Sequence, residues 1–392
     1  MTIAGVIAEY NPFHQGHALH LARTRALTGA DYLIVVMSGN YVQRGTPAMF
    51  DKYTRAKAAL MHGADLVLEL PPSVSTASAE YFAFGAVSLL NDTGIVTDLC
   101  FGSECGDLKK LWSAAAFLAD ESETYKTCLR RLLREGCSYP KARTKAMEQC
   151  GKTVPAELLL EPNNLLGIEY LKALSRSHST ICPHTIQRFG AHYHMQTLLK
   201  EGPASASGIR SMLLEQHGVF TPEILSQLPS GEIYQAYHGK PPLTEDLFSL
   251  LLLERLRRTP DEAFYRYFDV TEALSNRIHN CLDAFTSFSQ FTDLLKTRQL
   301  TRTAVSRALL HILLEIFSYE PASVLRVLGF RQEAAVLLQE LSMHSSLPLV
   351  TDASSPSLSS GWLFADRLYD TVRSFFHQIP YQKEGCRKML VL

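Results

Sequence analysis

Two histidines and a glycine near the N-terminus form the pattern with the clearest chemical potential. His14, Gly16 and His17 follow a short apolar run over residues 3–8, and a helical pattern starts beside them. Because the histidines are three residues apart, both rings can lie on one side of a helix entrance. Gly16 lets a phosphate approach the backbone, where free N–H groups favour anions. The pattern indicates a phosphate site in which imidazoles donate to charge developing on an α-phosphate. The alternative is that the histidines only cap a helix.

A second candidate phosphate site lies at Ala-Ser-Ala-Ser-Gly-Ile-Arg, residues 204–210. Ser205 and Ser207 can cap a helix and bind phosphate, and Arg210 can contact β- and γ-phosphates. The alternative is an ordinary capped helix with a surface arginine. Taken with the first pattern, the segment favours phosphate binding, and we expect His14, His17 and Arg210 to be catalytic.

The elements that must position these residues alternate between apolar strands and helices. Near-continuous apolar runs separated by helical patterns predict a parallel sheet covered on both faces. We therefore expect an α/β fold, a Rossmann-like doubly wound parallel sheet, with ligands bound at the carboxyl ends of its strands. The predicted strands are residues 3–8, 32–37, 66–70 and 96–101, with a further one at 185–189.

The alternation stops after Gly218, and the next twenty residues are rich in proline and glycine. We predict two domains, a catalytic one over residues 1–218 and an all-helical C-terminal one over residues 219–392. The helices expected in the second are residues 244–258, 271–284, 287–295, 301–317, 332–341 and 362–377.

Composition bounds the class of protein. The 392 residues are 46% hydrophobic and 20% charged, which excludes a chain disordered throughout. With 38 Lys and Arg against 39 Asp and Glu, the net charge of −1 gives no global attraction to nucleic acid, although a local basic patch remains open. No apolar run approaches about 20 residues and no secretory signal is visible, so neither a membrane span nor export is expected. Eight cysteines without a C-x-x-C pair indicate reduced thiols and a cytoplasmic protein.

Longer strings carry a resemblance to a known family. The His-Gln-Gly-His stretch resembles the H-x-G-H signature of the nucleotidyltransferase and class I aminoacyl-tRNA synthetase superfamily. More closely, the chain resembles the tRNA(Met) cytidine acetate ligase family over most of its length. The strings are Glu-Tyr-Asn-Pro-Phe-His-Gln-Gly-His (residues 9–17), Met-Ser-Gly-Asn-Tyr-Val-Gln-Arg-Gly (37–45), Phe-Gly-Ser-Glu (101–104), Pro-Asn-Asn-Leu-Leu-Gly (162–167), Thr-Ile-Gln-Arg-Phe-Gly-Ala (185–191) and the helical stretch 302–314.

The resemblance implies a two-step reaction. Such ligases use ATP to activate acetate as acetyl-adenylate and pass the acetyl group to N4 of the wobble cytidine of elongator tRNA(Met). Mg²⁺ is expected on the phosphates, with few protein ligands. The implied ATP-binding residues, with the two serines named above, are Ile7, Ala8, Glu9, Tyr10, Asn11, Pro12, Phe13, His14, Gln15, Gly16, His17, Ala18, Leu19, His20, Gly102, Asn163, Arg188, Ser205 and Ser207.

If RNA is the partner, a basic helical face in the second domain must supply affinity. Lys296, Arg298, Arg302 and Arg307 cluster around a predicted helix start and are the expected tRNA contacts. The alternative is a solvated helical face. Polar candidates near the acetyl-transfer step, among which the sequence selects no proton acceptor, are Ser38, Asn40, Gln43, Arg44, Asp51, Lys52 and Arg55.

Two other functions stay open at this point. One is an enzyme of the same superfamily that forms adenylates or transfers nucleotidyl groups to a small molecule, such as a pantothenate synthetase-like ligase. The other is a tRNA-binding protein with an inactive nucleotide domain. No protein metal site is expected, because the spacing of Cys182, His184, His192 and His194 fits no closed zinc site. The acetate pocket and the oligomeric state are not predicted.

Overall fold

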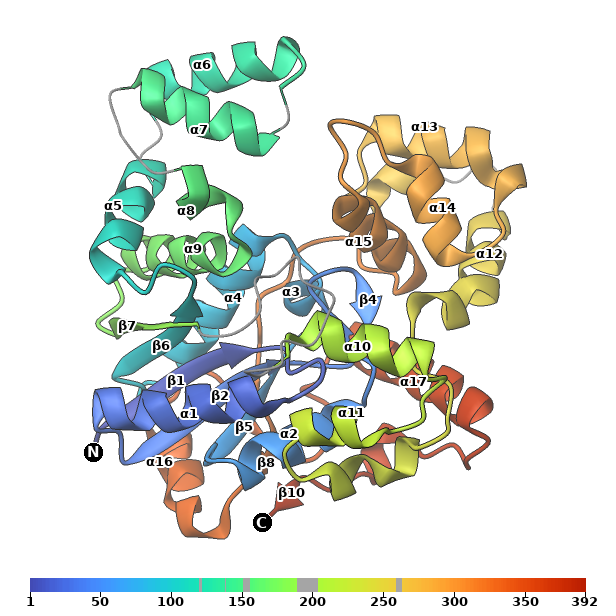
Figure 1. Ribbon diagram of the computed structural model, residues 1–392. Coiled ribbons are helices and arrows are strands. Elements are labelled where there is room, and N and C mark those ends of the chain that lie inside the picture. The colour runs from blue at the N-terminus through green and yellow to red at the C-terminus, as the bar shows by residue number, and fades with distance from the viewer. Residues whose placement is uncertain (120–121, 138, 151–155, 189–203, 259–262) are drawn as a thin grey trace.

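A single mixed sheet forms the centre of the molecule (Figure 1). The computed structural model describes residues 1–119, 122–137, 139–150, 156–188, 204–258 and 263–392. In this described part the sheet has eight strands, in the order β10-β8-β5-β2-β1-β6-β7, with β9 beside β8. The neighbours β5-β2-β1-β6-β7 are parallel, which confirms the doubly wound parallel core. These strands are β1 (Ile3–Ala8), β2 (Tyr32–Ser38), β5 (Leu66–Leu70), β6 (Asp98–Ser103) and β7 (Cys182–Gln187).

Helices cover both faces of the parallel strands, as near-continuous apolar strands require. One face packs against helices from residues 15–61 and 206–227, and the other against helices from residues 79–176. The first group is α1 (Gln15–Thr28), α2 (Lys52–Met61), α10 (Ala206–Glu215) and α11 (Pro222–Gln227). The second group is α4 (Ala79–Asp92) and α9 (Pro162–Arg176). On α9 pack α5 (Leu108–Ala119) and α8 (Ala156–Leu160), and farther from the sheet lie α6 (Glu123–Arg134) and α7 (Tyr139–Gln149) (Figure 1).

The prediction of an all-helical segment after residue 218 is wrong for its last third. The strand β8 (Leu325–Phe330) runs antiparallel to β5, and β9 (Leu349–Val350) and β10 (Leu390–Val391) pair with β8. Arg326 interrupts the apolar run of β8 in the sequence. Its guanidinium is neutralised by Glu69, Asp366 and Glu384, which lie far away in the chain. Only the tertiary structure makes this residue compatible with a buried strand.

The α/β unit also extends past the predicted boundary at residue 218. Phe220, Ile224 and Tyr234 are buried in the same cluster as β1, α1 and α2. A separate helical core begins near Leu243 and includes α17 (Ser360–His377). Its other helices are α12 (Ser249–Arg257), α13 (Glu272–Cys281), α14 (Phe288–Leu295) and α15 (Arg302–Leu313), and we call these four the C-terminal lobe.

The molecule has two projections. One is the C-terminal lobe, and the other comes from the crossover between β6 and β7. Instead of one helix, the described residues of this crossover form five, and α6 and α7 pack on each other away from the sheet (Figure 1). Among the described residues, no helix combines the length and apolar character needed to cross a membrane. The remaining short elements are β3 (Tyr41–Val42), β4 (Thr46–Pro47), α3 (Pro72–Ser75), α16 (Val336–His344), and the 3-10 turns Gly231–Tyr237, Glu245–Phe248, Phe264–Arg266, Leu282–Ala284, Gln332–Ala334 and Glu384–Cys386.

Candidate active site

The loop after β1 fixes both motif histidines at the start of α1. His14 is the N-cap of this helix, and its Nδ1 accepts a hydrogen bond of 3.0 Å from the Gly16 N–H. The Nδ1 of His17 in turn accepts from the His14 N–H at 3.3 Å. The two rings stack with centroids 3.8 Å apart. The histidines therefore cap the helix, as the plainer alternative held, but capping occupies only one nitrogen of each ring.

The other nitrogen of His14 is a buried donor without a partner. Because Nδ1 accepts, the proton of the neutral ring is on Nε2. Within the described residues, Nε2 of His14 forms no hydrogen bond, and neither do Nε2 of His20 and the Tyr10 hydroxyl. Burial, and then the charges of Arg188 and Arg210, lower the pKa of His14 to about 3. Burial, with Arg188, lowers the pKa of His20 to about 4. Both rings are thus neutral near pH 7, and a buried donor of this kind calls for an acceptor from a ligand.

A cavity of about 360 Å³ opens at the carboxyl ends of the parallel strands, within the range typical of small-molecule sites. It brings together both motifs predicted to bind phosphate, although Ser205 follows His17 by 188 positions in the chain. The predicted residues that line it are Ile7, Ala8, Glu9, Tyr10, Asn11, His14, Gly16, His17, His20, Gly102, Asn163, Arg188, Ser205, Ser207 and Arg210.

Five predicted residues of the first motif do not line the cavity. Phe13 is fully buried in the core between α1 and the sheet, and Leu19 is exposed on α1. Pro12 is buried and follows a cis peptide bond. Gln15 is exposed and Ala18 packs at the edge of the core. A continuous run from residue 7 to residue 20 thus includes residues that only support the site.

Two arginines that line the cavity, Arg188 and the half-buried Arg210, give it positive charge. Arg210 donates from one guanidinium nitrogen to the Asn11 carbonyl at 2.6 Å, which ties α10 to the loop after β1. Arg188 follows β7 and lies over Gly102, where a Cβ atom would be only 3.1 Å from the Arg188 Cγ. Gly102 therefore makes room for this side chain. Burial lowers the pKa of Arg210 to about 10, so its guanidinium keeps its proton at neutral pH.

Glu104 is a site residue that the sequence analysis did not single out. Its Oε1 accepts from the Asn163 backbone at 3.2 Å and from the Asn163 side chain at 2.5 Å. Its Oε2 accepts from the Asn164 N–H at 2.7 Å. The carboxylate thus caps the start of α9 and orients the Asn163 amide at the cavity edge. The Phe-Gly-Ser-Glu string contained the signal, but a partner 59 residues away could not be identified from it.

Most of the polar candidates for the acetyl-transfer step are structural. Lys52 is fully buried and forms ion pairs with Glu69, Asp366 and Glu384. Arg55 is also buried and donates to backbone carbonyls, among them that of Glu9 at 2.6 Å. The buried residues Ser38, Asn40 and Asp51 lie outside the cavity lining as well.

Gln43 and Arg44 are the two polar candidates that line the cavity. The Gln43 backbone N–H donates to Oε1 of Glu9 at 2.7 Å and so positions that carboxylate. Tyr170 and Phe82 were missed as lining residues. Each belongs to the apolar pattern of its own helix, which is typical of core residues. No sequence signal therefore distinguishes these two residues from residues of the core.

The predicted tRNA-binding residues lie on the C-terminal lobe, outside the cavity. Lys296 pairs with Asp293 at 3.1 Å, Arg302 pairs with Glu245 and Asp293 at 3.5 Å each, and Arg307 pairs with Asp269 at 2.9 Å. Arg307 is largely buried in this pair. Arg298 is exposed and has no ion-pair partner among the described residues.

Asp98, Cys182 and His184 come together at the opposite edge of the sheet, with donor atoms within 4.8 Å of one another. The Asp98 carboxylate already contacts Nε2 of His184 at 2.7 Å and accepts from the Thr97 hydroxyl. His192 and His194 lie outside the described residues.

The parallel sheet and the paired phosphate motifs define a nucleotidyltransferase of the H-x-G-H type. The family model "HIGH Nucleotidyl Transferase" matches residues 1–384. The chain is 38% identical over 366 residues to the tRNA(Met) cytidine acetate ligase of Acetivibrio thermocellus, covering 89% of this chain and 88% of that one. It is 34% identical to the Halothermothrix orenii enzyme of the same name, covering 100% and 99%.

Two solved structures share the whole fold. Thermotoga maritima TmcAL in its apo form is 30% identical and covers 100% of both chains, with a TM-score of 0.88. The same protein bound with alpha-thio ATP is 32% identical and covers 99% of this chain and 97% of that one, with a TM-score of 0.82. The chain therefore belongs to the tRNA(Met) cytidine acetate ligase family of HIGH nucleotidyltransferases.

Proposed function

We propose that this protein uses ATP and acetate to acetylate N4 of the wobble cytidine of elongator tRNA(Met), by way of acetyl-adenylate. The observation that carries the proposal is the Nε2–H of His14, which is buried in the cavity near Arg188 and Arg210 and has no partner among the residues that the structure describes. A neutral donor flanked by two cations suits a phosphate that gains negative charge during the reaction. The names of the relatives support the same activity.

In the first step a carboxylate oxygen of acetate attacks the α-phosphorus of ATP, the P–O bond to pyrophosphate breaks, and pyrophosphate leaves. Acetate is ionised at neutral pH, so this attack needs no general base. His14 and His17 contact the α-phosphate, and Ser205, Ser207 and Arg210 bind further along the triphosphate. The protein contributes positioning and preorganised charge rather than covalent chemistry.

Mg²⁺ is the metal expected on the phosphates. The described lining of the cavity offers one carboxylate, that of Glu9. Because Mg²⁺ is commonly held by one or two carboxylates plus phosphate oxygens and waters, this donor set fits an ion carried mainly by the nucleotide. Its chemistry would be to neutralise charge on the phosphate oxygens.

In the second step the cytidine N4 attacks the acetyl carbonyl carbon, the bond from that carbon to the AMP oxygen breaks, and AMP leaves. N4 loses one proton, and we propose that it passes to the carboxylate of Glu9, which lines the cavity. The base must leave its stack to reach this site, as is usual for bases read in RNA loops. Arg298, together with Lys296 and Arg302, would contact the RNA backbone on the C-terminal lobe, while Arg307 supports α15.

The decisive experiment incubates the protein with ATP, labelled acetate and total tRNA, followed by digestion to nucleosides. The proposal expects label in acetylated cytidine from elongator tRNA(Met) alone. His17→Ala is the inactive control, since it removes a ring of the phosphate site and should abolish acetate-dependent ATP–pyrophosphate exchange.

Two other results would overturn the proposal. Acetate-dependent release of AMP from ATP without labelled tRNA would indicate a small-molecule ligase. Binding of tRNA with no turnover of ATP would indicate a binding protein. Arg298→Glu with Arg302→Glu should weaken tRNA binding and leave the exchange reaction intact; equal loss of both would refute an RNA-binding role for these residues.

A further inference from the structure

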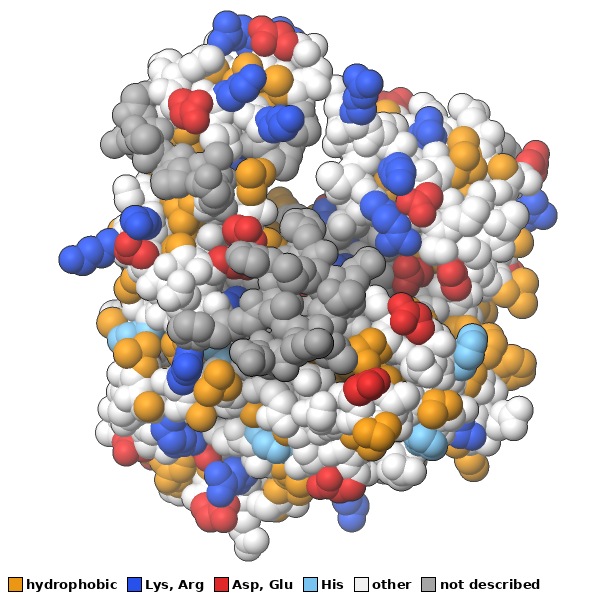
Figure 2. Space-filling view, in the orientation of Figure 1, with side chains coloured by type: hydrophobic (Ala, Val, Ile, Leu, Met, Phe, Trp, Pro, Cys, Tyr) orange, Lys and Arg blue, Asp and Glu red, His pale blue; other side chains and the backbone are white. Residues whose placement is uncertain are grey.

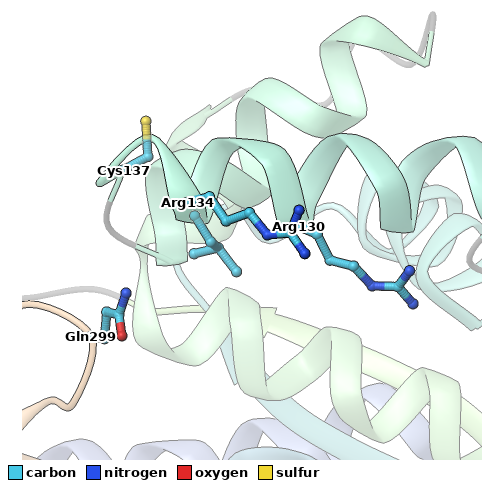
Figure 3. A pocket seen from close by; sticks show the side chains of 5 residues that line it. Arg130, Arg134, Cys137 and Gln299 are labelled. Atoms are coloured by element: carbon cyan, nitrogen blue, oxygen red, sulfur yellow. The ribbon is translucent and has the colours of Figure 1, made fainter.

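A second hollow, of about 380 Å³, lies between the two projections of the molecule. Its lining comes from α6 and from the loop that joins α14 to α15. Figure 3 shows Arg130 and Arg134 extending from α6, with Gln299 on the facing loop. The remaining lining residues are Leu133 and Cys137. The hollow therefore joins the α6–α7 hairpin to the C-terminal lobe.

The α6 wall carries two arginines, Arg130 and Arg134. The charge of Arg130 acts on the exposed Glu123 carboxylate, which forms its ion pair with Lys126. The helix buries Tyr125, Cys128 and Leu132 against its neighbours, which leaves the opposite side for charged residues. Arg130 and Arg134 are four residues apart, so they extend from the same side, and both are exposed. Within the described part of the chain, neither forms an ion pair or a hydrogen bond.

The neighbouring arginine, Arg131, differs from these two because it does have partners. Arg131 donates to the Gln149 side chain at 2.8 Å and lies 3.9 Å from the Glu135 carboxylate. Over residues 122–150 there are seven Lys and Arg against three Asp and Glu, although the whole chain has a net charge of −1. Positive charge is thus concentrated in this hairpin.

The facing wall is a structured turn. The Thr297 N–H donates to the Leu300 carbonyl at 3.0 Å, and the Leu300 N–H donates to the Thr297 hydroxyl at 3.0 Å. The turn presents the Gln299 amide to the hollow, and it also carries Arg298. Figure 2 shows Lys and Arg side chains on both upper projections, on either side of a notch.

We propose that this hollow binds the sugar-phosphate backbone of the tRNA stem next to the anticodon loop. Guanidinium groups and an amide suit phosphate oxygens and ribose hydroxyls, and among the described residues no acidic side chain lines the hollow. Contacts with both projections would hold the stem from two sides. They would thereby fix the distance from the stem to the active-site cavity. The inference rests on the proposed function, and it adds the α6–α7 hairpin as a second RNA-binding wall.

The test is the double variant Arg130→Glu with Arg134→Glu, with transcribed elongator tRNA(Met) as the probe. We expect the dissociation constant for this tRNA to be at least tenfold larger than that of the wild type. We also expect the affinity to depend less steeply on salt concentration. Each lost phosphate contact reduces the slope of log K against log salt by about 0.7–0.9, so two lost contacts reduce it by about 1.4–1.8. Acetate-dependent ATP–pyrophosphate exchange should stay within about twofold of wild type.

The matched control is Lys383→Glu with Lys388→Glu, which changes the net charge equally at exposed positions near the C-terminus. It should leave the affinity for tRNA almost unchanged. Arg130→Lys with Arg134→Lys should keep most of the affinity, because phosphate binding here depends chiefly on charge.

Wild-type affinity and salt slope in the charge-reversed protein would overturn the inference, while acetylation by the wild type would still uphold the proposed function. Equal weakening in the control would also overturn it, because the effect would then follow net charge. If the wild type neither binds nor acetylates tRNA(Met), the proposed function fails and the inference fails with it.

Discussion

Replacing His14 by asparagine separates the two roles that the structure gives this residue. The Oδ1 of asparagine takes the place of the imidazole Nδ1, so it can still accept from the Gly16 N–H and cap α1. Asparagine is among the preferred N-cap residues. The side chain ends before the position of Nε2, so the buried donor is lost. His14→Ala removes both the cap and the donor.

The magnitudes differ enough to be measured independently. Loss of one preorganised donor to a charged transition state costs about 100- to 1,000-fold in rate. Loss of an N-cap costs about 0.5–2 kcal/mol of stability. We therefore expect both variants to lose at least 100-fold in acetate-dependent ATP–pyrophosphate exchange. Urea unfolding should show a larger loss of stability for His14→Ala than for His14→Asn.

The result that refutes this reasoning is exchange in His14→Asn within about threefold of wild type. In that case capping would be the whole role of His14, and the unpartnered Nε2 would have no part in binding phosphate. A circular dichroism spectrum matching the wild type ensures that a low rate does not reflect unfolding.

Three further outcomes are expected. The lowered pKa values of His14 and His20 mean that only unfolded chains bind these protons below about pH 6.5. The free energy of unfolding should thus fall as pH drops from 6.5 toward 4, less steeply in His14→Asn; equal slopes in urea melts would contradict this. Lys52→Met leaves buried carboxylates without their lysine and should lose about 3–5 kcal/mol in urea unfolding, whereas a loss below 1 kcal/mol would show that Arg326 compensates. Glu104→Gln cannot accept all three hydrogen bonds at the start of α9. The free energy of unfolding should therefore fall by about 1–3 kcal/mol, and the KM for ATP should rise. An unchanged Tm and KM would argue against this capping role.

The parallel core could be predicted because its signals are local. The strands at residues 3–8 and 66–70 are found with the predicted bounds, since short apolar runs between helices can be recognised from neighbouring residues alone. The strand β8 could not be recognised in the same way. Its Arg326 is acceptable in a buried strand only because carboxylates from three distant segments surround it.

The same distinction between local signals and long-range contacts applies to the active site. The sequence determined the chemical types, namely two imidazoles at a helix start and an arginine at the start of another helix, because residue identity and spacing fix what a short motif can do. It did not determine which of those groups are free to act. Asn163 is committed to Glu104, Lys52 to an ion-pair cluster, and Arg307 to Asp269, while Nε2 of His14 has no partner in the described part of the chain. Those outcomes depend on contacts between segments far apart in the chain, and only the tertiary structure brings such segments together.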